Sequence, residues 1–225
     1  MANELRIGVI DSGCSPEQAT TLVAARRFRL EEGVLCEEAP VPDHLGHGSA
    51  VLARLQSEAG ALPMLMAQVF ERQWSTSALQ VAAALLWLVE EGATVVNLSL
   101  GLHQDRPVLR QACAEAQAAG VLLCASSPAR GGPVYPASYP GVLRITGDAR
   151  CAPGQWSWLG SGQADIGGSV GGQGMAGASL ACAALSGRIA RLLEQHPEMD
   201  HPQLLAHLRE AAAFTGPERR GAYNG

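Results

Sequence analysis

Three residues of types that cooperate in nucleophilic catalysis stand beside glycines at widely separated points of the chain. Asp11 precedes Ser12-Gly13, His47 lies between two glycines, and Ser179 follows Gly177-Ala178. A serine hydroxyl can attack a carbonyl carbon when an imidazole takes its proton and a carboxylate orients the imidazole. Acyl transfer is therefore the chemistry that these residue types can perform, provided that the fold brings them together.

The local sequence predicts that each of the three lies at the end of a helix or strand. Residues 5–10 form a short apolar, β-branched run, which predicts a buried parallel strand with Asp11 at its carboxyl end. In open α/β sheets, sites form at that edge. His47 opens a helix predicted to reach residue 55, and Ser179 lies at the start of one predicted over 177–193. Free N–H groups and the helix dipole would favour a developing oxyanion there.

Each residue taken alone also has a structural interpretation. Asp-Ser-Gly is a common turn sequence, and a serine before an apolar helix is commonly its N-cap. A single histidine before a helix has a structural role about as often as a functional one, given how little one sequence decides. The combination of all three in one chain favours catalysis.

The remaining segments alternate between predicted strands and helices. Strands are predicted over 62–70, 94–98, 121–125 and 142–146, helices over 76–91, 107–119 and 201–213, and short β segments over 156–166. Residues 14–45 are expected to be irregular apart from one strand near 33–36, and 216–225 to form a flexible tail. This alternation predicts one α/β domain over residues 1–225, with a mostly parallel twisted sheet and helices on both faces.

Composition narrows the class of protein. The 225 residues are 47% hydrophobic, which suffices for one full-sized core. Lysine is absent, which excludes Ser–Lys and Schiff-base chemistry, and the 16 arginines are scattered in a chain of net charge −5, which argues against a nucleic-acid surface. No apolar run has the roughly 18 residues of a membrane span, and the N-terminus lacks the pattern of a signal peptide. We therefore expect a cytoplasmic protein with no nucleic-acid or membrane partner.

The cysteines and histidines show no metal-binding pattern. Six cysteines without a CxxC pair are expected to be reduced thiols; they are residues 14, 36, 113, 124, 151 and 182. Neither HExxH, a Cys/His cluster nor an EF-hand loop is present. We expect no metal and no cofactor.

The segments around the three residues resemble motifs of the subtilisin family of serine peptidases, and they occur in that family's Asp–His–Ser order. Residues 9–13 (VIDSG) are similar to the aspartate motif, 46–51 (GHGSAV) to the histidine motif and 177–181 (GASLA) to the Gly-Thr-Ser-Met-Ala motif. Residues 96–101 (VNLSLG) are similar to the segment that pairs with substrate. The resemblance spans about residues 5–212. It implies a three-layer subtilisin-like fold and peptide-bond hydrolysis by Asp11, His47 and Ser179.

The resemblance also implies where substrate binds. Ser99, Leu100 and Gly101 on one side, and Ser126 and Ser127 on the other, would flank an extended peptide.

Three positions depart from the family pattern. Ala50 replaces a second histidine, Ala183 replaces a proline, and Ala129 stands where the family has its oxyanion asparagine. Loss of that donor was measured in subtilisin itself and costs on the order of 10²–10³ in rate. We therefore expect Ser126, Ser127 or Arg130 to donate instead, or the enzyme to be slow and dedicated.

Because the sequence shows neither a signal pattern nor a pro-segment, and the family's calcium loop is short here, we expect an intracellular processing role and no calcium site. Small forms of this kind resemble the dedicated leader-peptide proteases of peptide-maturation systems, such as that of quinohemoprotein amine dehydrogenase biogenesis. The expected partner is a peptide or protein substrate, which can be one dedicated precursor. Two alternatives remain: an inactive relative that binds a peptide or partner without cutting it, and an esterase that uses the same triad.

Two further motifs are interpreted as accidental. Residues 172–177 match G-x-G-x-x-G, but a dinucleotide site needs a strand before this motif and a βαβ unit around it. Residues 167–171 match the G-x-S-x-G elbow, with Asp200 and His207 in the order of an α/β-hydrolase. Ser169 leads into more glycine, however, whereas the elbow serine must lead directly into a helix.

Overall fold

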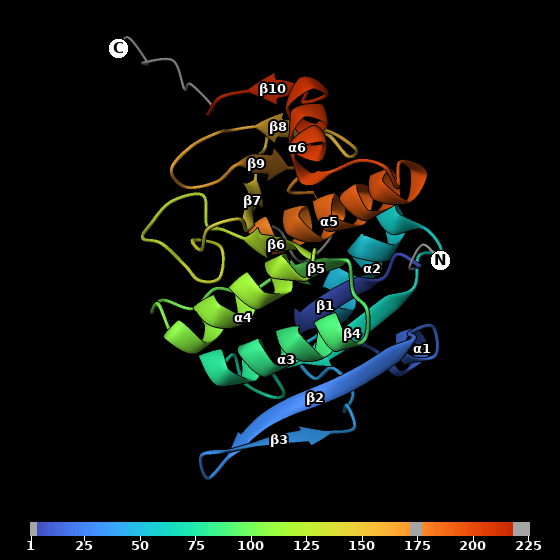
Figure 1. The fold of residues 1–225 in the computed structure, drawn as a ribbon, viewed down its shortest axis with the longest axis vertical. Coiled ribbons are helices and arrows are strands. Elements are labelled where there is room, and N and C mark those ends of the chain that lie inside the picture. Colours follow the sequence, from blue (N-terminus) through green and yellow to red (C-terminus); the bar gives the residue numbers. More distant parts are fainter. Residues whose placement is uncertain (1–3, 172–176, 218–225) are drawn as a thin grey trace.

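A ten-stranded sheet forms the centre of the computed structural model, which describes residues 4–171 and 177–217 (Figure 1). The strands lie in the order β10-β8-β9-β7-β6-β5-β1-β4-β2-β3. The five central strands are parallel and almost entirely buried: β1 (Ile7–Asp11), β4 (Met64–Gln68), β5 (Val95–Leu98), β6 (Leu122–Ser126) and β7 (Leu143–Gly147). Continuous apolar runs such as MLMA in β4 suit strands that are covered on both faces.

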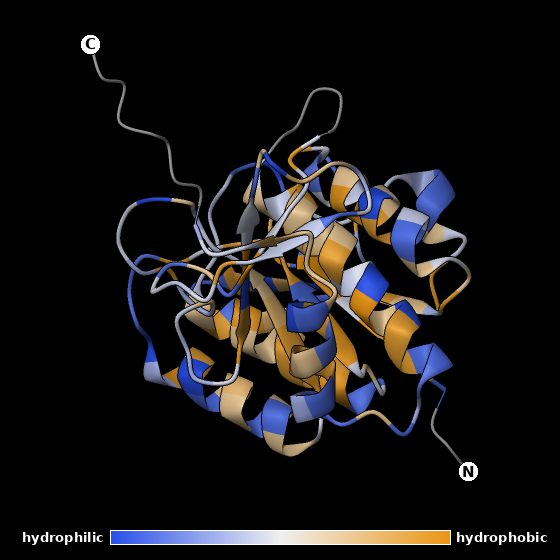
Figure 2. Cartoon of the chain, turned by 90° about the horizontal axis from the view of Figure 1, so that it is seen from above, coloured by the Kyte–Doolittle hydropathy of each residue, from blue (hydrophilic) through white to orange (hydrophobic). Residues whose placement is uncertain are grey.

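Helices cover the two faces of the sheet, so the predicted α/β fold with a mostly parallel sheet is confirmed. On one face α3 (Ala78–Glu90) packs against α4 (Pro107–Ala118), and on the other α2 (His47–Ala59) packs against α5 (Ala178–Gln195), with α6 (His201–Glu210) nearby (Figure 1). Each face has its own apolar cluster, and polar residues gather on the outer surfaces of the helices (Figure 2).

Helix α2 packs closely on α5. A Cβ at Gly187 would lie 2.5 Å from the carbonyl oxygen of Leu55, so only glycine permits this approach. The contact fixes the two helices that carry His47 and Ser179 relative to each other.

The prediction for residues 14–45 is partly wrong. This region contains α1 (Pro16–Ala19) and two antiparallel strands, β2 (Ala24–Glu31) and β3 (Val34–Glu38), of which only the second was expected. The sequence of β2, AARRFRLE, contains no apolar run. Its arginines are instead paired with glutamates across the hairpin. Arg26 lies 2.8 Å from Glu37, and Arg27 is bonded to Glu38. Cross-strand ion pairs of this kind stabilise a strand that hydrophobicity alone does not reveal.

The other predicted elements agree with the structure to within a few residues. The short β segments over 156–166 are β8 (Trp156–Trp158) and β9 (Ile166–Gly168), which pair antiparallel. Strand β10 (Phe214–Thr215) pairs with β8, and the N–H of Gly216 donates to Trp158 at 2.8 Å. The predicted tail is therefore still hydrogen-bonded at its first residue, and residues 218–225 lie outside the described chain. None of the described helices is both long enough and apolar enough to cross a bilayer.

Candidate active site

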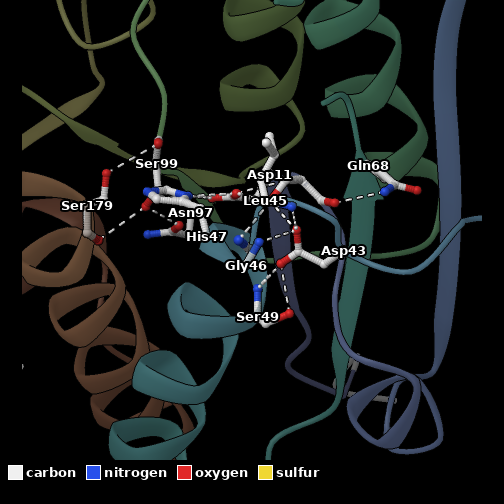
Figure 3. A network of polar contacts seen from close by, with 12 residues as sticks. Asp11, Asp43, Leu45, Gly46, His47, Ser49, Gln68, Asn97, Ser99 and Ser179 are labelled. Atoms are coloured by element: carbon white, nitrogen blue, oxygen red, sulfur yellow. Dashed lines mark hydrogen bonds and ion pairs between the residues drawn. The ribbon is translucent and has the colours of Figure 1, made fainter. Parts of the chain in front are cut away.

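Asp11 and His47 are hydrogen-bonded at the carboxyl edge of the sheet. The His47 Nδ1 lies 2.8 Å and 3.0 Å from the two carboxylate oxygens of Asp11 (Figure 3). Asp11 is the last residue of β1 and is 1% exposed, and His47 is the first residue of α2. A carboxylate can only accept, so the neutral imidazole carries its proton on Nδ1. Its Nε2 is then free to act as a base.

The glycines that flank His47 have separate roles. Gly46 has a φ of 74°, a left-handed conformation that admits the sharp turn into α2. Gly48 lies directly against the backbone of Gly13, and a Cβ there would overlap the Gly13 carbonyl oxygen. The absence of side chains therefore lets the start of α2 approach the end of β1.

The surroundings of His47 raise its pKa above the usual 6.5. Burial of the ring is the largest influence and by itself lowers the pKa. The hydrogen bond to Asp11, the charge of Asp11 and the charge of Asp43 act in the opposite direction and together outweigh burial. The site therefore stabilises the imidazolium, which is the form that follows proton uptake from a nucleophile.

Ser179 faces the same space from the first turn of α5. Its hydroxyl donates to the carbonyl oxygen of Ser99 at 3.4 Å, and the Ser99 hydroxyl lies 3.2 Å from the Ser179 carbonyl oxygen. Within the described chain, no hydrogen bond joins the Ser179 hydroxyl to His47. The structure thus brings all three predicted residues to one site, with the serine hydroxyl turned toward Ser99 (Figure 3).

A cavity of about 470 Å³ contains both His47 and Ser179 in its wall. One side of the cavity is formed by the segment after β5, residues 99–103, and the other by residues 70–76 of the loop after β4. Its lining includes the predicted substrate-binding residues Ser99, Leu100 and Gly101, together with Leu102, His103, Phe70, Trp74, Ser75 and Thr76. The mixture of extended backbone and apolar side chains suits an extended peptide.

The other two predicted substrate-binding residues, Ser126 and Ser127, are absent from that lining in the described chain. Ser126 is the last residue of β6. The Ser127 hydroxyl donates to Gln163 and its N–H to Ile145, each at 2.8 Å, so both of its donors are already used. Arg130 lines a different cavity.

Two residues near His47 were not singled out from the sequence. The ring of Trp74 meets the imidazole edge-on, with ring centroids 5.1 Å apart, although the residue is 61% exposed. Asp43 accepts hydrogen bonds from the loop around His47. Two sequence features could have identified these residues. Trp74 is a lone tryptophan in the polar run ERQWSTS, and Asp43 lies shortly before a glycine-flanked histidine.

The motifs interpreted as accidental have structural explanations where the structure describes them. Ser169 follows β9, and its hydroxyl accepts from the N–H of Gly171 at 3.4 Å. Asp200 is the N-cap of α6 and accepts from Gln203 at 2.8 Å. Residues 172–176 of the glycine-rich motif lie outside the described chain. All six cysteines are free thiols in the structure.

Sequence comparison finds relatives among bacterial proteases, although no protein-family model matches the chain. The thermostable alkaline protease of Halalkalibacterium halodurans is 28% identical over 154 residues, which cover 64% of this chain and 41% of the relative. Alkaline elastase YaB of Bacillus sp. strain YaB is 27% identical over 233 residues, 94% of this chain and 60% of the relative. The major intracellular serine protease of Bacillus subtilis is 24% identical over 161 residues, which cover 63% of this chain and 50% of the relative. This chain thus spans 41–60% of these relatives.

Solved structures show the same fold. A cold-adapted subtilisin-like serine proteinase superposes with a TM-score of 0.72 at 18% identity, covering 93% of this chain and 84% of the other. A lanthipeptide protease gives 0.69 at 16% identity, with coverage of 93% and 80%. The nisin leader peptidase NisP from Lactococcus lactis gives 0.64 at 16% identity, with coverage of 91% and 81%.

Proposed function

Because this chain belongs to the subtilisin-like family of serine proteases, we propose that it hydrolyses peptide bonds with Asp11, His47 and Ser179 as its triad. The observation that carries the proposal is the 2.8 Å bond between His47 and Asp11, made beside a cavity whose wall also contains Ser179. A buried carboxylate on Nδ1 leaves Nε2 as the only basic ring nitrogen, and that nitrogen is the one a serine nucleophile requires.

In the first step, the Ser179 hydroxyl leaves the Ser99 carbonyl and turns to Nε2 of His47. The bond that it gives up is long, at 3.4 Å, and a serine side chain moves readily between staggered rotamers. Catalytic hydrogen bonds of free enzymes are often long and tighten only when substrate binds.

Acyl transfer then follows. As Ser179 Oγ bonds to the scissile carbon, its proton passes to His47 and the carbonyl oxygen becomes an oxyanion. The first-turn N–H groups of α5, which lack helical acceptors, stabilise that charge. His47 gives the proton to the departing amine as the C–N bond breaks. Water next attacks the acyl carbon and gives a proton to His47, which returns it to Ser179 Oγ as the ester bond breaks, while Asp11 stays ionised throughout.

The peptide lies between residues 99–101 and the loop around Trp74. Backbone groups of the extended segment after β5 pair with the peptide backbone, which gives affinity without sequence preference. Preference comes from Phe70, Trp74, Leu100 and Leu102 in the cavity wall. These side chains favour an apolar residue beside the scissile bond.

The substrate in this proposal is the leader segment of one dedicated precursor peptide in the cytoplasm. Two of the structural neighbours are a lanthipeptide protease and a leader peptidase, and one relative is an intracellular protease. The replacement of the oxyanion asparagine by Ala129, together with the engaged donors of Ser127, also favours a slow enzyme with a narrow task. The precursor of the quinohemoprotein amine dehydrogenase system is one such candidate.

Incubation with precursor peptides, followed by mass spectrometry, tests the proposal. We expect one cleavage in the cognate precursor, little digestion of casein, and no cleavage by the Ser179→Ala variant. Cleavage that persists in Ser179→Ala would refute the role of this serine.

A peptide-binding protein without catalysis is the second candidate. The replaced asparagine and the orientation of the Ser179 hydroxyl toward Ser99 favour it. It predicts that wild type and Ser179→Ala bind the precursor equally well and that both leave it intact. The third candidate, an esterase, predicts turnover of an activated ester but of no peptide.

A further inference from the structure

Asp43 provides a second carboxylate beside the candidate active site. Its Oδ1 accepts from the N–H groups of Leu45 and Gly46 at 3.1 Å and 2.9 Å. Its Oδ2 accepts from the N–H and the hydroxyl of Ser49 at 2.8 Å and 2.7 Å. Asp43 therefore binds the chain on both sides of His47 (Figure 3).

These bonds supply what the start of α2 otherwise lacks. The N-cap of the helix is Gly46, which has no side chain to accept from the first-turn N–H groups. Asp43 accepts from one of them, that of Ser49, and places negative charge at the positive end of the helix dipole. Because His47 is the first residue of this helix, the same contacts restrain the position of its ring.

Ser12 connects Asp43 to Asp11. The Ser12 hydroxyl lies 2.9 Å from an oxygen of Asp43 and 3.2 Å from the Asp11 oxygen that also contacts His47, and it accepts from Gly48 at 2.9 Å. A hydroxyl has a single proton, and the shorter contact favours donation to Asp43. Asp43 thereby leaves more of the Asp11 charge for His47.

Among the described residues, the charges that act on His47 are those of Asp11 on β1 and Asp43 on the loop before α2. His103 lies across the cavity, and Cys14 lies beside Asp43. Burial by itself raises the pKa of Asp43. The hydrogen bonds donated by Ser49, Ser12 and Gly46 lower it and together outweigh burial, so the pKa of Asp43 lies below its usual value. Burial and the Asp43 charge raise the pKa of Cys14, which stays neutral. Asp43 is therefore charged at neutral pH and acts on His47 in the same sense as Asp11.

We propose that Asp43 is a positioning residue for His47, holding the imidazole toward Asp11 and favouring its protonated form during proton transfer from Ser179. This inference rests on the proposed triad for its catalytic consequence. Its effect on His47 itself can be measured without catalysis.

The first test is an NMR titration of His47 in the Ser179→Ala background, with and without Asp43→Asn. Removing the charge, and releasing the Ser12 hydroxyl to Asp11, should lower the pKa of His47 by roughly half a unit. Asp148→Asn is the matched control, because Asp148 is also a hydrogen-bonded carboxylate but is paired with Arg150 away from the site. The proposal would be overturned if the pKa of His47 were the same in Asp43→Asn as in the parent, or if Asp148→Asn changed that pKa by an equal amount.

The second test is the pH profile of kcat/KM on a cleaved precursor. In Asp43→Asn the acidic limb should move to lower pH by the same roughly half unit, with kcat reduced roughly threefold or more. If Asp43 had only a structural role, Asp43→Asn would lower the yield of folded protein but leave the acidic limb of the pH profile at the same pH. Absence of any cleavage by wild type would refute the proposed protease, while the NMR titration would still decide the effect of Asp43.

Asp43→Glu keeps the inference testable if Asp43→Asn does not fold. Glutamate retains the charge but displaces the acceptor oxygens from Leu45, Gly46 and Ser49. In Asp43→Glu we expect the pKa of His47 to stay close to that of the parent protein and kcat to be lower. A kcat equal to that of wild type, or a His47 titration lowered as far as expected for Asp43→Asn, would contradict the assignment.

Discussion

The Ser179 hydroxyl donates to the carbonyl oxygen of Ser99 at 3.4 Å, and the Ser99 hydroxyl in turn lies 3.2 Å from the carbonyl oxygen of Ser179. This pair links the end of β5 to the first turn of α5. It therefore connects the segment proposed to pair with substrate to the residue proposed to attack it. The Ser99 hydroxyl has a single proton, and its shorter contact, at 2.9 Å from the side-chain oxygen of the buried Asn97, favours donation there.

Ser99→Ala should destabilise the protein, because it leaves the Asn97 side-chain oxygen without this donor in the interior. Asn97 is fully buried, and an unpaired buried acceptor costs about 1–3 kcal/mol. Urea unfolding measures the change in the free energy of unfolding. Ser75→Ala, another serine in the cavity wall, should cost much less. Equal stability of Ser99→Ala and wild type would contradict the importance of this bond.

Gly48→Ala should separate His47 from Asp11. The new Cβ would overlap the Gly13 backbone, which cannot yield as a flexible side chain can, and overpacking of this kind costs about 1–3 kcal/mol. We expect lower stability and loss of cleavage. Gly162→Ala is the matched control, since no atom lies within 4 Å of a Cβ at that position. A Gly48→Ala variant with wild-type activity would show that the close approach is unnecessary.

The raised pKa of His47 gives activity and stability opposite pH dependences. Cleavage needs the neutral ring, so kcat/KM should fall as the pH drops through a value above 6.5. The stabilisation from the charged ring is fully present below the unfolded-state pKa and is lost as the pH rises through the folded-state pKa. Unfolding measured against pH for wild type and His47→Ala should therefore show a difference that shrinks toward alkaline pH. A constant difference would contradict this.

Trp74 should report on peptide binding. Its exposed ring lies edge-on to His47 and 5.7 Å from the ring of Phe70, in the wall that would contact the substrate. Trp74→Ala should raise KM roughly tenfold, which corresponds to about 1.4 kcal/mol of lost contact, with a smaller change in kcat. It should also abolish the change in tryptophan fluorescence when peptide binds to the Ser179→Ala variant.

Trp158→Phe is the control for this experiment, because Trp158 lines a different cavity. It should retain both the KM and the fluorescence change of the parent. A normal KM in Trp74→Ala would remove this residue from the proposed substrate site.

Prediction from sequence succeeded where a strand or helix is marked by an apolar pattern. The buried strand before Asp11 and the small-residue helix after Ser179 have such patterns, and parallel strands necessarily bring their carboxyl ends to one edge. Strand β2 was missed because its stability depends on arginines whose glutamate partners lie on another strand. Asp43 was missed because its role consists of contacts with a loop, which have no periodic signal. The orientation of the Ser179 hydroxyl is likewise a matter of rotamer, which sequence does not encode.

Phosphonylation by a fluorophosphonate probe tests the proposed triad most directly, because it requires an activated serine but no knowledge of the natural substrate. We expect intact mass spectrometry to show one adduct per chain, peptide mapping to place it on Ser179, and the adduct to be absent in Ser179→Ala. His47→Ala and Asp11→Asn should label on the order of 10³–10⁴ times more slowly. An unlabelled wild-type protein, or labelling of His47→Ala at the wild-type rate, would contradict the account.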